Sequence, residues 1–430
     1  RKDIIDLYGG EARMPNLRKL AKESMVYENA IAPSPWTYPS HVSLFTGMYL
    51  NEHGVYERED ARNITLNKYH ERLEAERLAE YMKRRGYHTL AISNNIMISR
   101  FTGFDRGFDQ FWSFDSTPWI KHREVEEARE LGAGPLQVFL GLAKRGRYSD
   151  ILRFGAVWAK ARLIEQTALN YPLNKGVELT NSILYNTNLD QSFFLFLNFM
   201  EAHEPYKGYN ERETMDNFTG RKKLGAGKIA YLKEQYVRSA EYLDEHLGNL
   251  IRMLEERGLY DNTLIVLTSD HGQAFGEHNF MYHGIYLYDE IVRVPLVIKY
   301  PRSRKFTKRK GYQSLTSVFG LIRNVIEGGD DKVLTTPTAV SESYGNTNRL
   351  PAAYADRAEY VSQRYEKKRI AVFEGGFKLT VNGTDGVIEE FIGAGTAKKS
   401  HPEGKRIGKM LAEAREIKKH ESFKVPNSSV

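Results

Sequence analysis

The chain has 430 residues and a mass of 49.5 kDa, a length that indicates one large domain with a smaller one beside it. Its 41% hydrophobic and 27% charged residues are typical of a folded globular protein, and it contains no run of about 20 apolar residues that could cross a bilayer. We therefore expect a soluble chain, either cytoplasmic or peripheral to a membrane, and the sequence does not decide between the two.

The formal net charge of +7 favours anionic partners such as phosphate esters, sulfate esters or acidic lipid surfaces. Nucleic acid ranks lowest among them, because the sequence shows no stacking module or zinc module. The chain contains no cysteine, which excludes disulfides and thiolate metal ligands but leaves the compartment and the oligomeric state open.

Helix-like and strand-like runs alternate over roughly the first 300 residues, as in an α/β sheet covered by helices on both faces. Helices are predicted at 16–24, 39–45, 73–85 and 231–257, and strands at 87–92, 193–200, 263–268 and 294–300. The long helix at 231–257 lies between two of these strands. Strand, long helix and strand in this order form the unit of a parallel sheet.

Residues from about 117 to 190 interrupt this rhythm with basic and aromatic sequence of helical character. One reading is a lid or an interfacial helix that meets lipid head groups. The other, which we favour, is a helical insertion that packs on the main body and turns a solvated basic face outward.

The C-terminal part, residues 331–430, has a different composition and indicates a small α+β subdomain. Strands are predicted at 360–373, 377–382 and 387–391, with turns at the glycines between them. A basic helix over 404–419 follows, and its lysines more often form a solvated face than a lipid contact.

The first run that carries chemistry extends from Trp36 to Gly47, in which Thr37 lies just before the helix that Pro39 opens. The hydroxyl of Thr37 can cap that helix, or it can attack an ester held at the helix N-terminus, where N–H groups and the helix dipole attract anions. His41 lies one turn later, where it can hydrogen-bond to Thr37 or cap the helix.

The second run contains Asp270 and His271, directly after the strand predicted at 263–268. Ligands of open α/β sheets bind beyond the carboxyl ends of the strands, and a carboxylate beside an imidazole suits a divalent cation. Strand-end aspartates and structural histidines are common, so this pair alone does not decide between a metal site and ordinary packing.

Taken together, these runs resemble the sulfatase branch of the alkaline phosphatase superfamily. The resemblance covers residues 1 to about 300 continuously and implies an alkaline phosphatase-like α/β domain over 1–330. That domain has a mainly parallel central sheet sandwiched by helices, and a small C-terminal α+β domain follows over 331–430. In chain order, the resemblance is carried by Pro15–Leu17, Asn29 with Ala30, the Thr37 run, Phe104–Phe108, Asn198–Tyr206, the Asp270 run, and Tyr288–Glu290 with Arg293–Pro295.

The Thr37 run departs from the sulfatase signature at two positions. Thr37 stands where sulfatases carry the cysteine that becomes formylglycine, and His41 replaces an arginine. Thr37 is instead similar to the threonine of lipoteichoic acid synthases and phosphoethanolamine transferases, in which a metal-bound threonine attacks phosphorus. The resemblance therefore implies a metal-dependent phosphodiesterase or phosphotransferase that passes through a covalent phosphothreonine.

This resemblance also assigns roles to individual residues. Asp270, His271 and Thr37 are expected to hold one divalent cation, which could be Mn, Ca, Zn or Mg. His203 and His283 are expected to face the transferred group, where they stabilise its oxygens or protonate the leaving alcohol, and His41 is expected to bind substrate beside them. The expected substrate is an anionic phosphate or sulfate ester, with a lipid-linked phosphate included.

Two alternatives stay open, which are sulfate ester hydrolysis without formylglycine and an anion-binding member of the family that has lost turnover.

Members of the family open with a strand that ends in an acidic metal ligand, just before a pair that resembles Arg1 and Asp3. Either such a strand and its acid lie upstream of Arg1, which we favour because a missing central strand would leave backbone groups unpaired, or the metal site has one carboxylate fewer and the first strand is missing.

Overall fold

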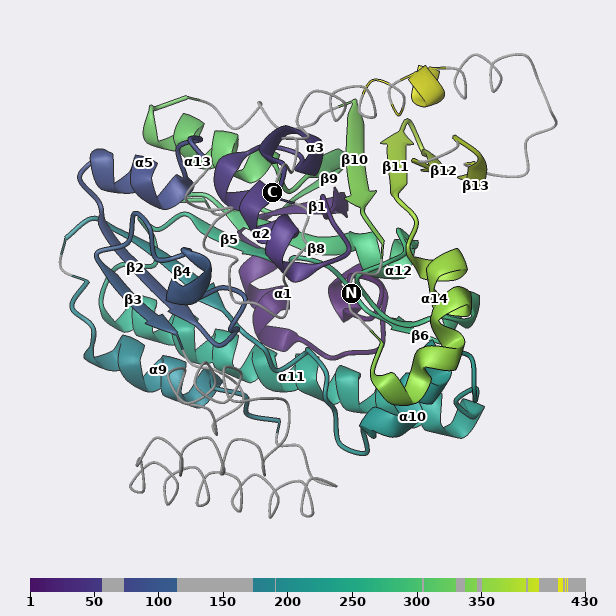
Figure 1. The fold of residues 1–430 in the computed structure, drawn as a ribbon. Coiled ribbons are helices and arrows are strands. Elements are labelled where there is room, and N and C mark those ends of the chain that lie inside the picture. Colours follow the sequence, from purple (N-terminus) through teal and green to yellow (C-terminus); the bar gives the residue numbers. More distant parts are fainter. Residues whose placement is uncertain are drawn as a thin grey trace, which may run out of the picture.

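The computed structural model describes residues 1–55, 73–113, 173–189, 191–303, 305–329, 337–345, 350–383, 386–393 and parts of 409–416. Strands form a central layer with helices on both faces, and a second sheet lies beside it (Figure 1). In the described part of the chain, no helix combines the length and the apolar character that a membrane crossing requires. Most of the expected insertion at 117–190 lies outside the described residues, which resume at Leu173.

The central layer contains two sheets. In the first, β3 (Gln110–Ser113), β2 (His88–Ser93) and β4 (Phe193–Asn198) run parallel in this order. In the second, the order is β5 (Ile265–Thr268), β8 (Arg293–Lys299), β1 (Met25–Ile31) and β9 (Thr307–Ser314), and β8 runs antiparallel to both of its neighbours. The expected mainly parallel sheet is confirmed apart from β8. The segment that joins β5 to β8 contains no crossover helix longer than α12 (Asp289–Val292) within the described residues, so the chain returns antiparallel.

The predicted unit of strand, long helix and strand is present in the chain as β4, α11 (Ala226–Glu256) and β5. Its two strands do not pair with each other among the described residues, since β4 ends one sheet and β5 ends the other. Every residue of both strands is half-buried, whereas β1 and β8 are mostly buried.

Two layers of helices cover the strands. On one face, α2 (Thr37–Thr46), α5 (Leu78–Arg84) and α13 (Ser317–Ile326) share one apolar cluster with β1 and β8. On the other face, α1 (Pro15–Ala21) and α11 pack on β1, β5 and β8, while α9 (Val177–Asn186) and α11 cover β2 and β4. Figure 1 shows α11 and α9 along the lower side of the view and α5 with α13 along the upper side. Shorter elements are α3 (Leu50–His53), α10 (Glu211–Phe218), β6 (Ala274–Phe275) and β7 (Met281–Tyr282), with 3-10 turns at Asp6–Tyr8, Arg100–Thr102, Glu277–Asn279 and Ala352–Arg357.

The C-terminal sheet is antiparallel, as expected, but it has four strands in the order β10 (Thr338–Ser343), β11 (Arg369–Glu374), β12 (Phe377–Asn382) and β13 (Ile388–Ile392). The strand predicted at 360–373 is wrong in its first half. Residues Ala358–Tyr365 form helix α14, whose Val361 and Tyr365 pack into a core cluster, and helical burial there prevails over the β-branched and aromatic composition. The described positions between 409 and 416 are helical, in agreement with the predicted basic helix.

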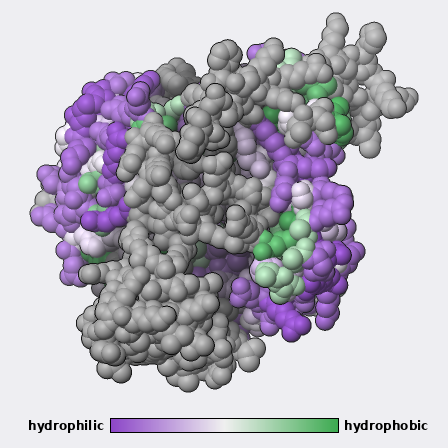
Figure 2. Space-filling model, in the orientation of Figure 1, coloured by the Kyte–Doolittle hydropathy of each residue, from purple (hydrophilic) through white to green (hydrophobic). Residues whose placement is uncertain are grey.

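The outer strand β13 leaves apolar side chains exposed. Figure 2 shows apolar atoms at this end of the molecule, at the upper right of the view, and a second apolar group at the centre right. The exposed side chains are Val387, Ile388, Phe391 and Ile392.

A carboxylate from α11 caps the N-terminus of α1. Asp244, which is 1% exposed, accepts hydrogen bonds from the main-chain N–H groups of Asn16 at 2.9 Å and Leu17 at 2.7 Å. The side chain of Asn16 donates a third bond, of 3.0 Å, to the same carboxylate. The cap therefore comes from a residue 228 positions away, and it ties α1 to the long helix.

Lys299, the last residue of β8, is fully buried. Its Nζ donates to the main-chain carbonyl groups of Tyr260 at 2.7 Å, Asp261 at 3.3 Å and Thr263 at 3.2 Å. These carbonyls belong to the segment that enters β5, so one side chain joins β8 to the start of its neighbouring strand.

Replacing Asp244 by alanine is expected to lower the free energy of unfolding by about 3 kcal/mol, because a buried N–H group and a partly buried one lose their acceptor. Urea unfolding measures this difference. The control is Glu241→Ala on the same helix, whose exposed carboxylate accepts one bond from Arg13, and we expect a change below about 1 kcal/mol. Equal losses in the two variants would show that Asp244 does not act as a buried cap.

Candidate functional site

Thr37 lies at the start of α2, two residues earlier than the sequence predicted the helix to begin. Trp36 takes the N-cap position and Thr37 is the first helical residue, so the capping role for Thr37 is wrong. The side chain is buried, with 4% of its residue surface exposed. Its Oγ1 lies 3.1 Å from Nε2 of His271, which makes this hydroxyl part of a polar site at the carboxyl end of β5.

His271 holds the hydroxyl of Thr37 through one defined ring nitrogen. Its Nδ1 lies 2.8 Å from the main-chain carbonyl of Gly272, and a carbonyl can only accept, so Nδ1 carries the proton. Nε2 is therefore the acceptor for the Thr37 hydroxyl. This arrangement directs the Thr37 oxygen toward the residues that follow β5.

Asp270 lies against the same imidazole, with Oδ2 3.5 Å from Nε2 of His271 and 3.5 Å from Nδ1 of His41. Ser40 on α2 donates a hydrogen bond of 2.7 Å to the main-chain carbonyl of Asp270 and so ties the helix to this segment. Burial acts to raise the pKa of Asp270, but the neighbouring imidazoles outweigh it and lower this pKa to about 2. Asp270 is therefore an anionic group beside Thr37 at neutral pH.

His41 is fully engaged within the protein. Its Nδ1 donates to the main-chain carbonyl of Thr37 at 2.8 Å, and its Nε2 accepts from the amide of Asn198 at 3.2 Å. Burial lowers the pKa of this imidazole, so the ring is held neutral. The geometry favours the reading in which His41 supports α2 near Thr37, and substrate binding by His41 stays a prediction.

His203 and His283 come together from segments that are far apart in the chain. The first follows β4 and the second follows β7, and their ring centroids lie 5.1 Å apart. His283 also stacks on His271 at 4.2 Å, so the three imidazoles form one continuous group. Burial lowers the pKa of His283 to about 3, which keeps the ring neutral.

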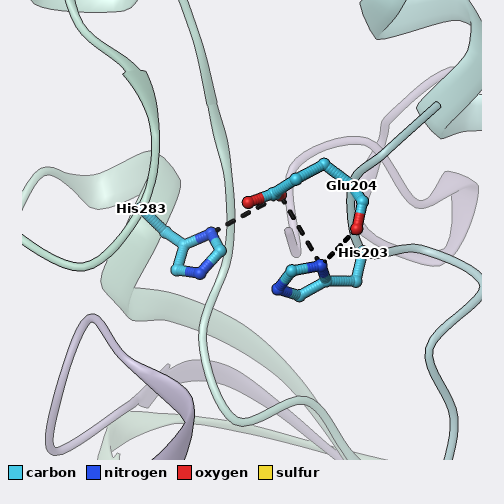
Figure 3. A group of neighbouring side chains, drawn as sticks. All are labelled: His203, Glu204 and His283. Carbon is cyan, nitrogen blue, oxygen red and sulfur yellow. Dashed lines mark hydrogen bonds and ion pairs between the residues drawn. The ribbon is translucent and has the colours of Figure 1, made fainter. Parts of the chain in front are cut away.

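Glu204 lies between the two histidines (Figure 3), and Gln273 contacts both Glu204 and His283. Gln273 accepts a hydrogen bond of 2.7 Å from Nδ1 of His283 and donates one of 2.9 Å to Glu204. Burial opposes ionisation of Glu204, yet its pKa is lowered to about 2, because His203 and His283 lie next to the carboxylate. Sequence reasoning did not single out either residue, although Glu204 stands between His203 and Pro205 in a run that it did identify.

Arg1 fixes the loop that carries Gln273. Its buried guanidinium donates to the main-chain carbonyl of Gln273 at 3.2 Å and to Glu277 at 2.7 Å, and it pairs with Asp3. The loop between β5 and β8 is thus held from the N-terminal segment. The strand expected upstream of Arg1 stays a prediction.

The donor atoms of Thr37, His271 and Asp270 fit a small divalent cation. Successive donors lie 3.1 and 3.5 Å apart, from Thr37 Oγ1 to His271 Nε2 and from there to Asp270 Oδ2. Ligand atoms around a cation with bonds of about 2.0–2.2 Å are themselves about 3.0–3.5 Å apart. Two oxygens and one imidazole nitrogen are suitable donors for the cations expected from the sequence.

Comparison with known proteins identifies a family that this chain matches. Residues 1–323 match the family model described as Sulfatase. An uncharacterized sulfatase of Escherichia coli strain K12, YidJ, is 23% identical over 335 residues, which is 70% of this chain and 61% of that protein. An arylsulfatase of Clostridium perfringens strain 13 is 24% identical over 331 residues, which is 70% of this chain and 66% of that protein. The chain thus aligns with less than two thirds of the length of these two relatives.

Solved structures confirm the α/β fold expected from the sequence. The crystal structure of a phosphonate monoester hydrolase of Agrobacterium radiobacter superposes with a TM-score of 0.64 and 15% sequence identity. The superposition covers 98% of this chain and 94% of that chain. At this level of identity the likeness shows the shared fold, and the chemistry has to come from the residues of the site.

Replacing His283 by glutamine is expected to make the fold less sensitive to acid. The folded-state pKa of His283 is about 3 and that of an unfolded histidine about 6.5, so between these values the unfolded chain binds the additional proton. This group alone should lower the free energy of unfolding of the cation-free wild type by about 2 kcal/mol from pH 7 to pH 5. Urea unfolding at both pH values measures the difference between wild type and variant.

The control for this experiment is His278→Gln, which alters an exposed histidine. It should keep the acid sensitivity of the wild type. An equal loss of stability in wild type and in His283→Gln would contradict a buried neutral His283.

Proposed function

The chain belongs to the sulfatase family, and we propose that it hydrolyses or transfers phosphate esters with Thr37 as the attacking group. The observation that carries this proposal is the hydrogen bond of 3.1 Å between Thr37 Oγ1 and His271 Nε2. It brings a hydroxyl at the start of a helix next to Asp270 and His271, at the strand edge where α/β sheets bind their ligands.

The chemistry begins with the Thr37 hydroxyl. The Thr37 hydroxyl loses its proton to solvent and its Oγ1 attacks phosphorus to form a phosphothreonine, while the bond from phosphorus to the alcohol of the ester breaks and that alcohol takes a proton from His203. The N-terminal dipole of α2 favours an anionic group at this position. The bond from His41 to the carbonyl of Thr37 holds the residue in place through its main chain, so the side chain keeps its direction.

Asp270, His271 and Thr37 are the residues that would hold one divalent cation. Such a cation, when bound, lowers the pKa of an alcohol and neutralises the charge that develops on the ester oxygens. Asp270 contributes a carboxylate that is already ionised at neutral pH, and its main chain is fixed by Ser40. The site therefore offers an anionic oxygen, an imidazole nitrogen and a hydroxyl.

His203 and His283 divide the proton transfers between them. Nδ1 of His283 carries a proton toward Gln273, so Nε2 holds the free lone pair of the ring and can accept a proton. It suits the second step, in which water or an acceptor alcohol loses a proton as it attacks the phosphothreonine. His203 is more exposed, 28% against 9%, and when its Nε2 also carries a proton, that proton can pass to the leaving alcohol.

Sulfate ester hydrolysis is the second candidate, and membership of the sulfatase family supports it. Residue chemistry favours phosphate, because a formylglycine hydrate expels sulfate by collapsing to its aldehyde and threonine lacks the second hydroxyl that this requires. A phosphothreonine is opened by attack on phosphorus, so hydrolase and transferase share one intermediate. A lipid-linked phosphate or a glycerol phosphate is a suitable substrate in this proposal, with or without contact to a membrane.

Replacing Thr37 by alanine is expected to lower kcat on bis(4-nitrophenyl) phosphate by roughly three orders of magnitude or more, because the covalent step is lost. Serine at the same position retains the hydroxyl and should restore part of the rate. Initial rates are measured with Mn, Zn, Ca or Mg, beside 4-nitrophenyl sulfate at equal concentration. Intact mass after mixing with a slow diester should show a phosphoryl adduct on the peptide that contains Thr37.

The matched control is Thr46→Ala at the other end of α2, where the hydroxyl bonds to the carbonyl of Val42. This variant should lose some stability and keep its rate. A preference for the sulfate ester would favour the second candidate. An unchanged rate in Thr37→Ala would show that Thr37 is not the nucleophile. A wild type that turns over neither ester would favour the anion-binding alternative.

Replacing Asp270 by asparagine is expected to weaken binding of Mn by roughly 100-fold or more, because an anionic donor becomes neutral. Isothermal titration of the folded protein measures the affinity without reference to activity. The control is Asp109→Asn, which alters a carboxylate paired with Lys83 just before β3, at the opposite edge of the parallel strands. Equal affinity in the two variants would exclude Asp270 as a ligand.

A further inference from the structure

Glu204 lies between the two histidines assigned to the ester. Its Oε2 is 3.7 Å from Nδ1 of His283 and 3.8 Å from Nδ1 of His203, and it accepts a hydrogen bond of 2.9 Å from Gln273. Figure 3 shows the carboxylate placed between the two rings, with Nδ1 of each ring turned toward it. One carboxylate therefore faces the same nitrogen of two imidazoles.

The hydrogen bonds determine which ring nitrogen carries the proton. Gln273 donates from Nε2 to Glu204, so Oε1 of the same amide accepts from Nδ1 of His283. Nδ1 of His203 lies 2.5 Å from the main-chain carbonyl of Glu204, which can only accept. Both rings thus carry a proton on Nδ1, and Nε2 is the nitrogen left for an ester oxygen or a water.

The ring of His283 is also coupled to the nucleophile. It stacks on His271 with centroids 4.2 Å apart and an angle of 29°, and His271 contacts Thr37. It meets His203 edge-on at 5.1 Å and 72°. A rotation of His283 would disturb both neighbours, so a group that fixes this ring also fixes the geometry around Thr37.

We propose that Glu204 is a positioning residue that orients His203 and His283 together, acting through its negative charge and through Gln273, with both Nε2 atoms toward the ester. This inference rests on the proposed function, because it assigns the two histidines to the transferred group. Carboxylates behind histidines fix ring orientation and tautomer in many sites, and their loss typically costs about 10–100-fold. A single carboxylate serves two rings here, so its removal should affect both proton transfers at once.

A cation among the same three residues is the competing arrangement, since His203, Glu204 and His283 each offer a ligand atom within 4.8 Å of the others. The hydrogen bonds oppose it. Both Nδ1 atoms direct a proton at an oxygen, so a cation would have to displace Gln273 from His283 and the main-chain carbonyl of Glu204 from His203. The hydrogen-bonded arrangement is the one that the geometry supports.

The test uses Glu204→Gln, which keeps the size of the side chain and an acceptor for Gln273 while it removes the charge. We expect kcat on bis(4-nitrophenyl) phosphate to fall by about 10–100-fold with KM changed by less than about threefold, because ring orientation acts on the transition state. In cation-free wild type, nitrogen-15 NMR of the imidazole rings should show the Nδ1–H tautomer at both histidines. The variant keeps the bonds of both Nδ1 atoms to Gln273 and to the main-chain carbonyl of residue 204 but loses the charge, so the Nδ1–H tautomer should remain the main form while the Nε2–H form becomes detectable at both rings.

The matched control is Glu201→Gln in the same loop, a buried carboxylate that accepts from the main-chain N–H groups of Lys175 and Val177. It should lower stability without changing the two tautomers. If Glu204→Gln folds poorly, the NMR spectrum of the wild type still decides, because a proton on Nε2 of either ring would overturn the proposal.

Three further results would overturn it. The first is a kcat of Glu204→Gln equal to that of the wild type. The second is a pair of histidine tautomers that the substitution leaves unchanged. The third is a second equivalent of Zn or Mn that binds to the wild type but not to Glu204→Gln. Failure of the proposed function is a separate outcome, recognised by a wild type that turns over neither ester while its histidine tautomers remain as expected.

Discussion

The candidate site depends on one contact between segments 234 residues apart, the hydrogen bond between Thr37 and His271. Sheet topology makes this contact. Because β8 runs antiparallel between β1 and β5, the two outer strands of this trio run in the same direction and deliver the residues after their carboxyl ends to one edge. Thr37 follows β1, and Asp270 with His271 follows β5. Since β8 starts at this same edge, the loop before it brings His283 to the site as well.

Much of this edge could be predicted from the sequence, because an apolar strand ends where a run of polar residues begins. The apolar run before Asp270 is short and changes abruptly to polar residues, so the pattern predicts that Asp270 lies at the end of a strand. The same holds for the run that leads to His203. The direction of β8 in the sheet could not be predicted from the sequence, because its apolar pattern is compatible with a parallel or an antiparallel strand. Only its pairing with β1 and β5 shows that it runs antiparallel.

The partners of the site residues were harder to predict, because they are set by contacts between distant side chains. Gln273 lies two residues after His271, but its part in the site comes from its hydrogen bonds with His283 and with Glu204. Glu204 is 69 positions away in the sequence. The contact of His41 with Asn198 was equally hard to predict, because the two residues are 157 positions apart. Local pattern does fail where packing overrides composition, as in α14, where an aromatic and β-branched segment is helical.

The buried ammonium of Lys299 has a consequence for how the central strands recognise one another. A lysine can remain inside a protein when carbonyl groups surround its charge, and here three of them come from the turn that precedes β5. Successive residues of a strand face opposite sides of a sheet, so a slip of β8 by one position would turn this charge away from its acceptors into an apolar layer. Lys299 thus favours the observed register in the pairing of β5 with β8. The alignment of the two strands that border the candidate site is therefore set in part by a residue at the other end of these strands.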